Sequence, residues 1–241
     1  MRIALYGYGK MGHAIEQAAL RRGHEVVLRI DHGNAGTPPT GADAAIEFSR
    51  PETALGNMRL CVDHGVPVVV GTTGWYHRMA EVEELVRQGG GSLIWASNFS
   101  IGVQLFFRLN RYLAALMEGR TGYAATIEET HHVHKLDAPS GTAISLAQGI
   151  AAANGGYNGW EMADGGNGDK GNGARPVPIV SHREGEVPGT HVVTWSGGED
   201  KITLAHEAFG RQGFATGAVI AAEWLRGRKG FFTMDDLLGP A

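Results

Sequence analysis

The sequence predicts an α/β protein in which a Rossmann-type, doubly wound parallel sheet is joined to a second α+β domain with a mixed or antiparallel sheet. Three observations predict this. Short apolar runs alternate with helical patterns over the first hundred residues, which is typical of a parallel sheet. A glycine-rich turn directly follows the first apolar run. Three strand-like runs are grouped late in the chain, which favours an antiparallel or mixed sheet.

The first part of the chain contains five expected strands. They are 2–6 ("RIALY"), 25–30 ("EVVLRI"), 42–49 ("ADAAIEFS"), 66–74 ("VPVVVGTTG") and 92–100 ("SLIWASNFS"). A helix is expected over 13–22, ended by Gly23. A second helix is expected after the third strand, with Ser49 as its cap, Pro51 in its first turn and Glu52 three residues after the cap.

The later part begins with a helix expected over about 103–117 and a strand over 123–130. Ser140 is expected to cap a helix over 142–154. The stretch 155–175 is so rich in Gly and Asn that we expect a mobile loop. The remaining expected elements are strands at 176–184, 191–197 and 201–209, and an apolar helix at 213–227 that returns to the first domain.

Composition excludes several classes of protein. The chain has 241 residues, of which 43% are hydrophobic and 19% charged, as in ordinary globular proteins. A net charge of -4 gives no reason to expect nucleic acid as a partner. The single cysteine, Cys61, excludes an intrachain disulfide and favours a reducing compartment. No apolar stretch is long enough for a membrane span, so we expect a cytoplasmic protein without a membrane partner.

Gly7, Gly9 and Gly12 form the pattern G-x-G-x-x-G between a predicted strand and a predicted helix. The first glycine permits a tight turn, the second lets a pyrophosphate approach the backbone, and the third lets the helix pack closely. Asp31 ends the second strand, where a carboxylate can accept both ribose hydroxyls and repel a 2′-phosphate. The pattern predicts a dinucleotide site that favours NAD. The alternative is a glycine-rich turn that binds no nucleotide.

Other residues are candidates for the same site. Lys10 is either a phosphate contact or a solvated loop lysine. Ligands of open α/β sheets bind beyond the carboxyl ends of the strands. Gly71, Thr72 and Thr73 end the fourth strand, and Asn98 and Phe99 follow the fifth, so they are candidates to line a nicotinamide pocket. The alternative for each segment is a turn that only ends a strand.

The densest group of titratable residues is "ETHHVHKLDAPSGTA" at 129–143. His131, His132 and His134 are too close along a strand to face one way, because neighbouring side chains point to opposite faces. No Cys cluster or H-E-x-x-H accompanies them, so we expect no metal site.

An anionic substrate fits the same segment better. Ser140, Gly141 and Thr142 open a helix and offer backbone N–H groups and hydroxyls to a carboxylate. Lys135 and the histidines add positive charge and transferable protons. A dicarboxylate held against a nicotinamide agrees with this chemistry. The alternative is a capped helix after a polar loop.

The segment "HHVHKLDAPSGTA" is similar to the signature of the 4-hydroxy-tetrahydrodipicolinate reductase family. The resemblance continues in "GYGKMG", "IEFSRPE", "VVGTTG", "ASNFSIGV" and "HEAFGRQGFATGA", and it spans nearly the whole chain. It implies that NADH, NADPH or both reduce a small cyclic imine dicarboxylate to tetrahydrodipicolinate in lysine and diaminopimelate biosynthesis.

The resemblance also implies roles for residues. His131 is the proton donor or acceptor, Lys135 is the proton donor, and His132, Gly141 and Thr142 bind the substrate together with Ser140. The expected cofactor contacts are Gly7, Tyr8, Gly9, Lys10, Met11, Gly12, Asp31, Gly71, Thr72, Thr73, Ala96, Ser97, Asn98 and Phe99. Many relatives carry Glu-Arg where this chain has Asp31-His32, which weakens the case for strong NADPH binding.

The expected domains are a dinucleotide-binding domain, 1–101 completed by 209–241, and a substrate-binding and oligomerisation domain, 102–208. The family resemblance implies a homotetramer formed through the second domain's sheet. Two other functions stay open. One is another two-domain NAD(P)-dependent amino-acid or imine dehydrogenase, and the other is a non-catalytic NAD-sensing protein.

Overall fold

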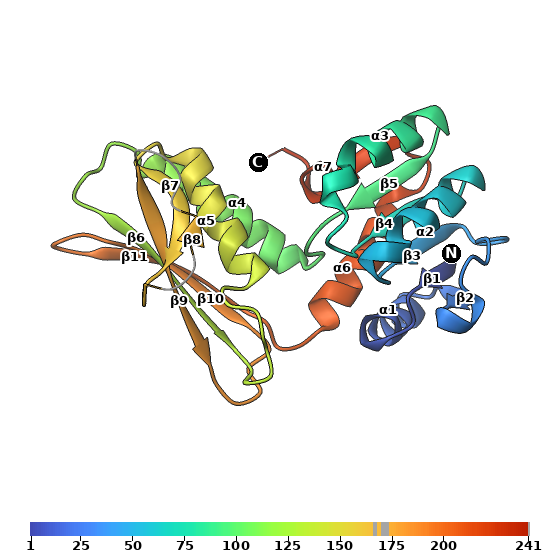
Figure 1. The fold of residues 1–241 in the computed structure, drawn as a ribbon, viewed down its shortest axis with the longest axis horizontal. Helices are drawn as coiled ribbons and strands as arrows, with labels where there is room; N and C mark the ends of the chain where they lie inside the picture. Colours follow the sequence, from blue (N-terminus) through green and yellow to red (C-terminus); the bar gives the residue numbers. More distant parts are fainter. Residues whose placement is uncertain (166–167, 170–173, 241) are drawn as a thin grey trace. The chain divides into compact units, whose positions relative to one another are not determined.

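The computed structural model describes residues 1–165, 168–169 and 174–240. The chain divides into two compact units (Figure 1): unit 1 comprises 1–101 together with 211–241, and unit 2 comprises 102–210. Among the described residues, no helix combines the length and the apolar character that a membrane span requires.

Unit 1 contains a six-stranded sheet in which every strand pair is parallel. Its strands are β1 (Arg2–Tyr6), β2 (Glu25–Ile30), β3 (Ala44–Glu47), β4 (Val68–Val70), β5 (Ser92–Trp95) and β12 (Gly230–Thr233). The order is β12-β5-β4-β3-β1-β2, so β1 lies between β2 and β3. This confirms the predicted doubly wound parallel sheet. The short strand β12 was not predicted, because four residues give no readable periodicity.

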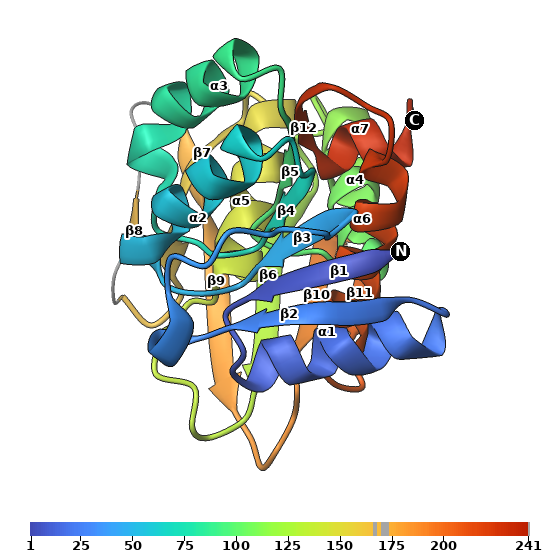
Figure 2. The same ribbon diagram turned by 90° about the vertical axis from the view of Figure 1, so that its right-hand side faces the viewer.

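Helices cover both faces of this sheet (Figure 2). On one face lie α1 (Lys10–Arg21) and α6 (Gln212–Leu225), and on the other lie α2 (Pro51–Asp63) and α3 (Met79–Gln88). The short elements are η1 (His32–Asn34), η2 (Tyr76–Arg78) and α7 (Met234–Leu238). Ile3 and Leu5 of β1 pack on the α1–α6 side, whereas Ala4 and Tyr6 pack on the α2–α3 side. The C-terminal helix α6 therefore belongs to the core of unit 1.

The predicted cap of α2 is wrong. Arg50, not Ser49, is the N-cap residue, and Pro51 begins the helix. The Ser49 hydroxyl instead donates to the carboxylate of Glu47 and lies 2.9 Å from the hydroxyl of Thr53. Glu47 is fully buried at the end of β3, and a buried carboxylate needs donors from its neighbours.

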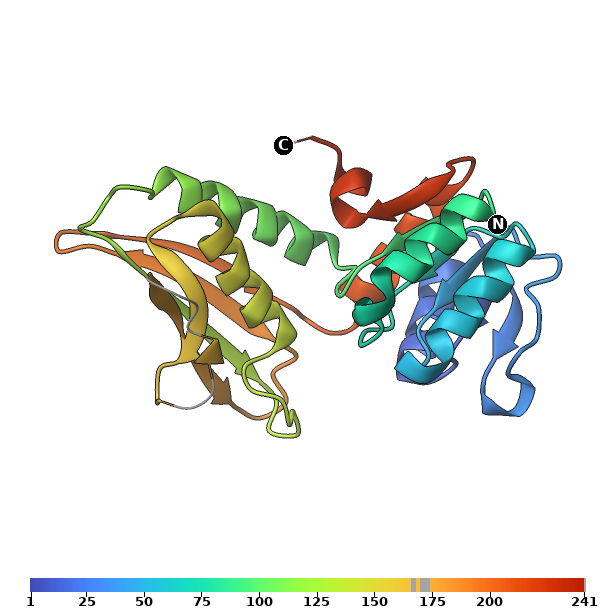
Figure 3. The same ribbon diagram turned by 45° about the horizontal axis from the view of Figure 1, so that its top comes forward.

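Unit 2 contains a six-stranded mixed sheet, as predicted. Its strands are β6 (Ala124–His131), β7 (Tyr157–Met162), β8 (Gly168–Asp169), β9 (Arg175–Arg183), β10 (Thr190–Ser196) and β11 (Lys201–Glu207), in the order β11-β10-β6-β9-β7-β8. β6 pairs antiparallel with β10 and parallel with β9. Helices α4 (Ile101–Leu116) and α5 (Gly141–Ala153) pack on one face (Figure 3). Within the described part of the chain, no helix covers the opposite face.

The prediction of a mobile loop over 155–175 is wrong for its first half, where β7 is a strand paired with β9. Tyr157 is buried, and its ring lies edge-on to that of Trp195 at 5.5 Å between centroids. Its hydroxyl accepts a hydrogen bond of 2.7 Å from the backbone N–H of Ala125. This aromatic anchor holds the segment in the sheet despite its glycines. Residues 166–167 and 170–173 of the predicted loop lie outside the described residues.

Candidate active site

The glycine turn of unit 1 is tight at two positions and open at one. Gly7 has a φ of +91°, and a Cβ there would lie 2.1 Å from the backbone oxygen of Phe48. A Cβ on Gly12 would lie 2.3 Å from the backbone oxygen of Gly7. By contrast, nothing lies within 4 Å of a Cβ built on Gly9. The turn therefore leaves room only at the position where a phosphate would approach the start of α1.

A pocket opens at the carboxyl ends of the central strands of unit 1. Because β1 pairs with β2 on one side and β3 on the other, this is the switch point at which open α/β sheets bind ligands. The residues that line it include Gly7, Gly9, Asp31, His32, Ser49 and Arg50. Arg50 was quoted in a motif but not predicted as a site residue. It places a guanidinium in a pocket suited to a dinucleotide.

Asp31 lies in this pocket and is more than half exposed. One carboxylate oxygen accepts a hydrogen bond of 2.8 Å from the backbone N–H of His32, which begins η1. Asp31 is also the N-cap residue of η1, and its side chain forms a capping box with Asn34. The imidazole of His32 lies 3.9 Å from the bonded oxygen, so it offers a cation beside the ribose position when it is protonated.

The remaining predicted residues of the glycine turn have different surroundings. Lys10 is the first residue of α1 and is exposed. Tyr8 packs its ring against His13, and its hydroxyl donates to Glu16. Met11 packs against the hydrophobic core. Of these three, only Lys10 has an unobstructed side chain to offer a phosphate.

The predicted cofactor contacts at the strand ends, residues 71–73 and 96–99, also differ in their burial and contacts. Thr72 is buried, and its hydroxyl accepts a hydrogen bond of 2.8 Å from the backbone N–H of Ser49, which joins the ends of β3 and β4. Gly71 packs against the ring of Phe48, whereas Thr73 and Ser97 are exposed. Asn98 accepts a hydrogen bond of 2.9 Å from the backbone N–H of Ser100. The side chains of Ala96 and Phe99 belong to the hydrophobic core, so only their backbones can face a cofactor.

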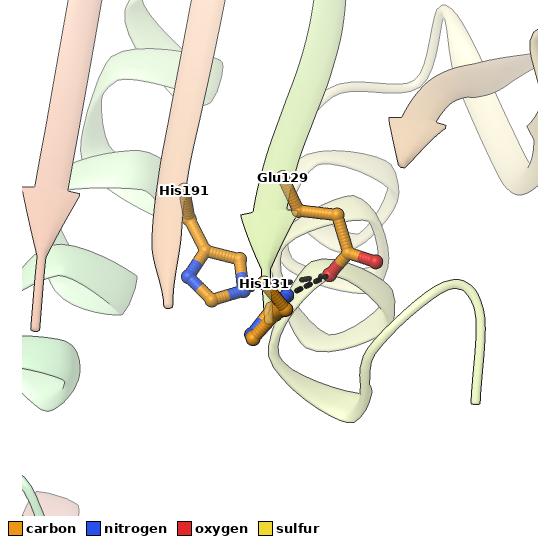
Figure 4. A group of neighbouring side chains, drawn as sticks. All are labelled: Glu129, His131 and His191. Atoms are coloured by element: carbon orange, nitrogen blue, oxygen red, sulfur yellow. Dashed lines mark ion pairs between the residues drawn. The ribbon is translucent and has the colours of Figure 1, made fainter. Parts of the chain in front are cut away.

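In unit 2 the alternation of β6 carries polar residues into the interior. Ala125, Ile127, Glu129 and His131 share the buried face of the strand. In the strand register, His191 on β10 and Ser181 on β9 lie opposite Glu129. Figure 4 shows Glu129, His131 and His191 converging, with the carboxylate of Glu129 directed toward both imidazoles.

Glu129 is the centre of this polar cluster, and its side chain is fully buried. The backbone N–H of Ser140 donates to both of its carboxylate oxygens, at 3.0 and 3.1 Å, and the hydroxyl of Ser181 donates at 2.8 Å. Burial by itself raises the pKa of Glu129, but interactions with His191, Ser140 and Ser181 outweigh burial and lower it to about 2. Glu129 is therefore ionised inside the protein.

His131 is also buried, and its Nδ1 lies 3.5 Å from a carboxylate oxygen of Glu129. That distance is too long for a good hydrogen bond, and Nδ1 has no such partner among the described residues. Burial lowers the pKa of His131 to about 4; Glu129 opposes this, while His191, Lys135 and Arg183 add to it. His131 is neutral at pH 7 and lies next to an anion.

Glu129, His131 and His191 each offer one metal-ligating atom, and these atoms lie within 4.8 Å of one another. Two observations argue against a metal centre. The carboxylate already accepts hydrogen bonds from Ser140 and Ser181, and the guanidinium of Arg183 lies 3.6 Å from it. A cation beside the carboxylate opposes a second one, so we interpret the group as a hydrogen-bonded network.

The other titratable residues of the histidine-rich segment lie outside the buried cluster around Glu129. His132 is half-buried, and His134 is exposed with its Nε2 3.1 Å from Glu186. This agrees with the expectation that the three histidines do not face one way. The Nζ of Lys135 lies 2.7 Å from the carboxylate of Asp137, yet Lys135 is close enough to His131 to lower its pKa.

The turn at the start of α5 combines a buried cap with an open end. Ser140 caps the helix as predicted, because its hydroxyl accepts a hydrogen bond of 3.2 Å from the backbone N–H of Ala143. The same hydroxyl lies 3.1 Å from His191 Nε2, so it is engaged and buried. Gly141 is exposed, nothing lies within 4 Å of a Cβ built on it, and Thr142 is half-buried. Gly141 and Thr142 are the residues of this turn that can meet a ligand.

Comparison with known proteins covers the whole chain. Residues 1–99 match the family described as dihydrodipicolinate reductase, N-terminus, and residues 102–238 match dihydrodipicolinate reductase, C-terminus. The 4-hydroxy-tetrahydrodipicolinate reductase of Christiangramia forsetii is 45% identical over 99% of this chain and 98% of its own length. That of Chromobacterium violaceum is 34% identical over 96% and 95%.

The chain belongs to the dihydrodipicolinate reductase family. Members of this family are NAD(P)H-dependent oxidoreductases of lysine and diaminopimelate biosynthesis. Among solved structures, the dipicolinate-bound dihydrodipicolinate reductase from Paenisporosarcina sp. TG-14 aligns with a TM-score of 0.77 at 24% identity over 97% of both chains. An amine dehydrogenase from Mycobacterium smegmatis aligns with a TM-score of 0.59 at 12% identity over 96% of this chain and 94% of its own. These two likenesses show the fold.

The family signature is readable in the sequence, but four residues of the polar cluster around His131 are not. Glu129, Ser181, Arg183 and His191 were not predicted as site residues. A signal for Glu129 existed, because it shares the period-two face of Ala125, Ile127 and His131, and a carboxylate on an apolar face needs an explanation. The other three come from strands distant in sequence, and no local pattern joins them to the signature.

Proposed function

We propose that this protein catalyses the NAD(P)H-dependent reduction of dihydrodipicolinate, formed from 4-hydroxy-tetrahydrodipicolinate, to tetrahydrodipicolinate. One observation supports this function most directly: His131 and the helix start at Ser140 share the buried carboxylate of Glu129. An imidazole that can carry a proton, next to a helix N-terminus that can hold a carboxylate, suits the reduction of an anionic imine. The relatives named for this substrate support the same conclusion.

Unit 1 is the proposed dinucleotide-binding domain. The open position at Gly9 and the free N–H groups at the start of α1 suit a pyrophosphate. Asp31 is proposed to bind the ribose hydroxyls, and Lys10 to contact a phosphate. Segments 71–73 and 96–99 are proposed to line the nicotinamide side, with Ala96 and Phe99 contributing backbone. When bound, NADH or NADPH supplies the hydride.

Unit 2 is the proposed substrate-binding domain. Gly141 and Thr142 hold one substrate carboxylate at the start of α5, and His132 and Lys135 add positive charge. The dipicolinate bound to the Paenisporosarcina reductase is a small planar dicarboxylate, which supports a substrate of this class. Ser140 contributes through its backbone and its cap, because its hydroxyl is buried and engaged.

The proposed proton chemistry follows from the charge that develops on the substrate. Adding a hydride to the conjugated imine leaves an electron pair on the ring that requires one proton. Lys135 donates this proton from its ammonium, which solvent then restores. His131 exchanges protons with this site, and the cations around it stabilise the developing negative charge. The reaction consumes one hydride and one proton for each product formed.

We further propose that the protein is a cytoplasmic homotetramer assembled through the mixed sheet of unit 2. The face of this sheet opposite α4 and α5 carries half-buried side chains, among them Thr126, Val180, Val192 and Thr194. A sheet face of this composition suits burial against a second copy. Sedimentation of the intact chain measures this assembly directly.

The test of the function is an NADH and NADPH oxidation assay with freshly generated dihydrodipicolinate, run in parallel with amino acids as substrates of the reverse, oxidative reaction. We expect turnover only with dihydrodipicolinate, and competitive inhibition by pyridine-2,6-dicarboxylate. Thr142→Val should weaken binding of that inhibitor, whereas Thr40→Val, at an exposed position of unit 1, should not.

The outcomes separate the candidate functions. Turnover of an amino acid but not of dihydrodipicolinate would assign an amino-acid dehydrogenase. Cofactor binding without turnover of any substrate would indicate an NAD sensor. Inhibition unchanged by Thr142→Val would place the substrate carboxylate elsewhere.

A further inference from the structure

Glu129 contacts two parts of the proposed site that are distant from each other in the sequence. It lies on β6 with His191 opposite it on β10 and Ser181 opposite it on β9. The carboxylate is buried and ionised, and it faces both His131 and the first turn of α5. The inference that follows rests on the proposed function.

The first part is the substrate-binding turn. The backbone N–H of Ser140 donates to both carboxylate oxygens of Glu129, at 3.0 and 3.1 Å. Ser140 is also the N-cap of α5, so this contact attaches the residue that begins the helix to the centre of the sheet. Gly141 and Thr142 come next along the chain. Their backbone N–H groups are therefore positioned by a residue whose own N–H is held by Glu129.

The second part is His131. Its Nδ1 lies 3.5 Å from Glu129 Oε2, and its other ring nitrogen, Nε2, lies beside Gly189, where a Cβ would approach it to 3.0 Å. An anion beside Nδ1 favours the tautomer that carries its proton there, and this leaves the lone pair of Nε2 free. The absence of a side chain at position 189 leaves the Nε2 edge uncrowded.

The charged groups around His131 come from four segments. They are Glu129 on β6, Arg183 on β9, His191 on β10 and Lys135 in the loop after β6. Glu129 is the one anion in this described set, and the others are cationic or become so on protonation. Glu129 is therefore the group that opposes the loss of a proton from His131.

We propose that Glu129 is a positioning residue that couples the substrate-binding turn at Ser140 to the proton-carrying imidazole of His131. Its hydrogen bonds to Ser140 place the turn, and its negative charge holds the tautomer of His131 and stabilises the imidazolium. In this role it resembles the buried carboxylate of a catalytic triad, which orients a histidine without taking its proton. No bond to substrate is made by Glu129 itself.

Two substitutions separate the two roles. Glu129→Gln removes the charge but keeps an oxygen that can accept from Ser140, whereas Glu129→Ala removes both. Glu83→Gln is the control, because it makes the same change of charge at an exposed residue of α3 in unit 1, outside the site and the proposed assembly face. Circular dichroism and sedimentation establish that each variant is folded and assembled.

The first measurement is the NMR titration of the His131 ring, which requires no turnover. In the wild type we expect a midpoint near pH 4, and in Glu129→Gln a midpoint displaced to lower pH, because the one stabilising anion is gone. In Glu83→Gln, the His131 ring should titrate like that of the wild type. An unchanged His131 titration in folded Glu129→Gln would overturn the proposal.

The second measurement compares steady-state rates and the binding of pyridine-2,6-dicarboxylate. In Glu129→Gln we expect kcat to fall by about 10–100-fold, with inhibitor binding changed by less than about threefold. In Glu129→Ala the inhibitor should bind at least about tenfold more weakly. If both variants bind it as tightly as the wild type, the turn is not held by Glu129. If Glu129→Ala does not fold, Glu129→Gln and the titration decide the question.

The two proposals can fail separately. A wild-type protein that does not reduce dihydrodipicolinate refutes the proposed function, yet the His131 titration still tests the pairing with Glu129. An active wild type whose His131 titration, kcat and inhibitor binding are all insensitive to Glu129 refutes only the positioning role.

Discussion

The Nζ of Lys135 lies 2.8 and 2.7 Å from the two carboxylate oxygens of Asp137, two residues along the chain. Burial raises the pKa of Asp137, but the hydrogen bond from Lys135 contributes to a net lowering, so the pair is ionised. The ammonium that is proposed to protonate the substrate thus forms an ion pair with a carboxylate. It must leave this partner to reach a ring carbon.

Replacing Lys135 tests its role as the acid. Lys135→Ala should lower turnover by about 10²–10⁴-fold, which is the usual effect of losing a positioned acid. NADH affinity should stay unchanged, because the glycine turn belongs to unit 1 and Lys135 to unit 2. Steady-state rates and NADH titrations measure both. Lys229→Ala, at an exposed lysine of unit 1, is the control. Near-normal turnover in Lys135→Ala would show that Lys135 is not the proton donor.

The glycine turn permits a paired test of stability and binding. Gly7→Ala places a Cβ 2.1 Å from the backbone of Phe48 at a φ of +91°, so it should cost at least about 1–3 kcal/mol of unfolding free energy. Gly9→Ala meets no protein atom within 4 Å and should leave the unfolding free energy unchanged.

Gly9→Ala should nevertheless crowd a bound pyrophosphate. We expect the Kd of NADH to rise roughly 5- to 150-fold, corresponding to about 1–3 kcal/mol of steric cost. Denaturant unfolding and fluorescence titration measure the two effects. Tight NADH binding by Gly9→Ala would mean that the dinucleotide does not approach this turn.

Asp31 is expected to set the choice of cofactor. Asp31 is more than half exposed and lines the pocket, where its negative charge would repel a 2′-phosphate. We expect kcat/KM for NADH to equal or exceed that for NADPH. Asp31→Ala should shift the ratio toward NADPH, whereas Asp63→Ala, at an exposed position at the end of α2, should not. A strong NADPH preference that is unaffected by Asp31→Ala would contradict this role.

His131 should make the stability of the protein depend on pH. Its pKa falls from 6.5 to about 4 in the folded state, because the buried imidazole resists protonation. The stabilisation is therefore complete above pH 6.5 and is lost as the pH falls from 6.5 toward 4, by up to about 3 kcal/mol. Below pH 4 both states are protonated and His131 adds no further loss.

Denaturant unfolding between pH 7 and pH 4 measures this effect. His131→Asn should flatten the decline in that window, and His77→Asn, at an exposed histidine of unit 1, should not. Glu129 affects stability at lower pH, because its pKa is depressed from 4.5 to about 2. Its contribution to the unfolding free energy is lost as the pH falls through that range. Equal slopes for wild type and His131→Asn would show that His131 is not held neutral by burial.

Local patterns were sufficient for much of the architecture. The parallel sheet followed from apolar runs alternating with helices, and the turn at Gly7 followed from glycines between a strand and a helix. Ser140 was identified as a cap because a serine before an apolar run satisfies a helix N-terminus locally. Ser49 carried the same signal and failed, because a buried carboxylate at Glu47 competed for its hydroxyl. Local propensity cannot anticipate a partner that is supplied by burial.

The register of the strands in unit 2 decided which residues surround Glu129. Glu129, Ser181 and His191 meet because β9 and β10 flank β6 with these residues in line, and a shift by one residue would turn each side chain to the other face. Nothing near position 129 in the sequence specifies which residues of later strands lie opposite it. Residues 129–143 therefore sufficed to predict His131, Lys135 and the turn at Ser140 as candidates for the site, whereas the buried carboxylate of Glu129 acquired its partners only when the sheet assembled.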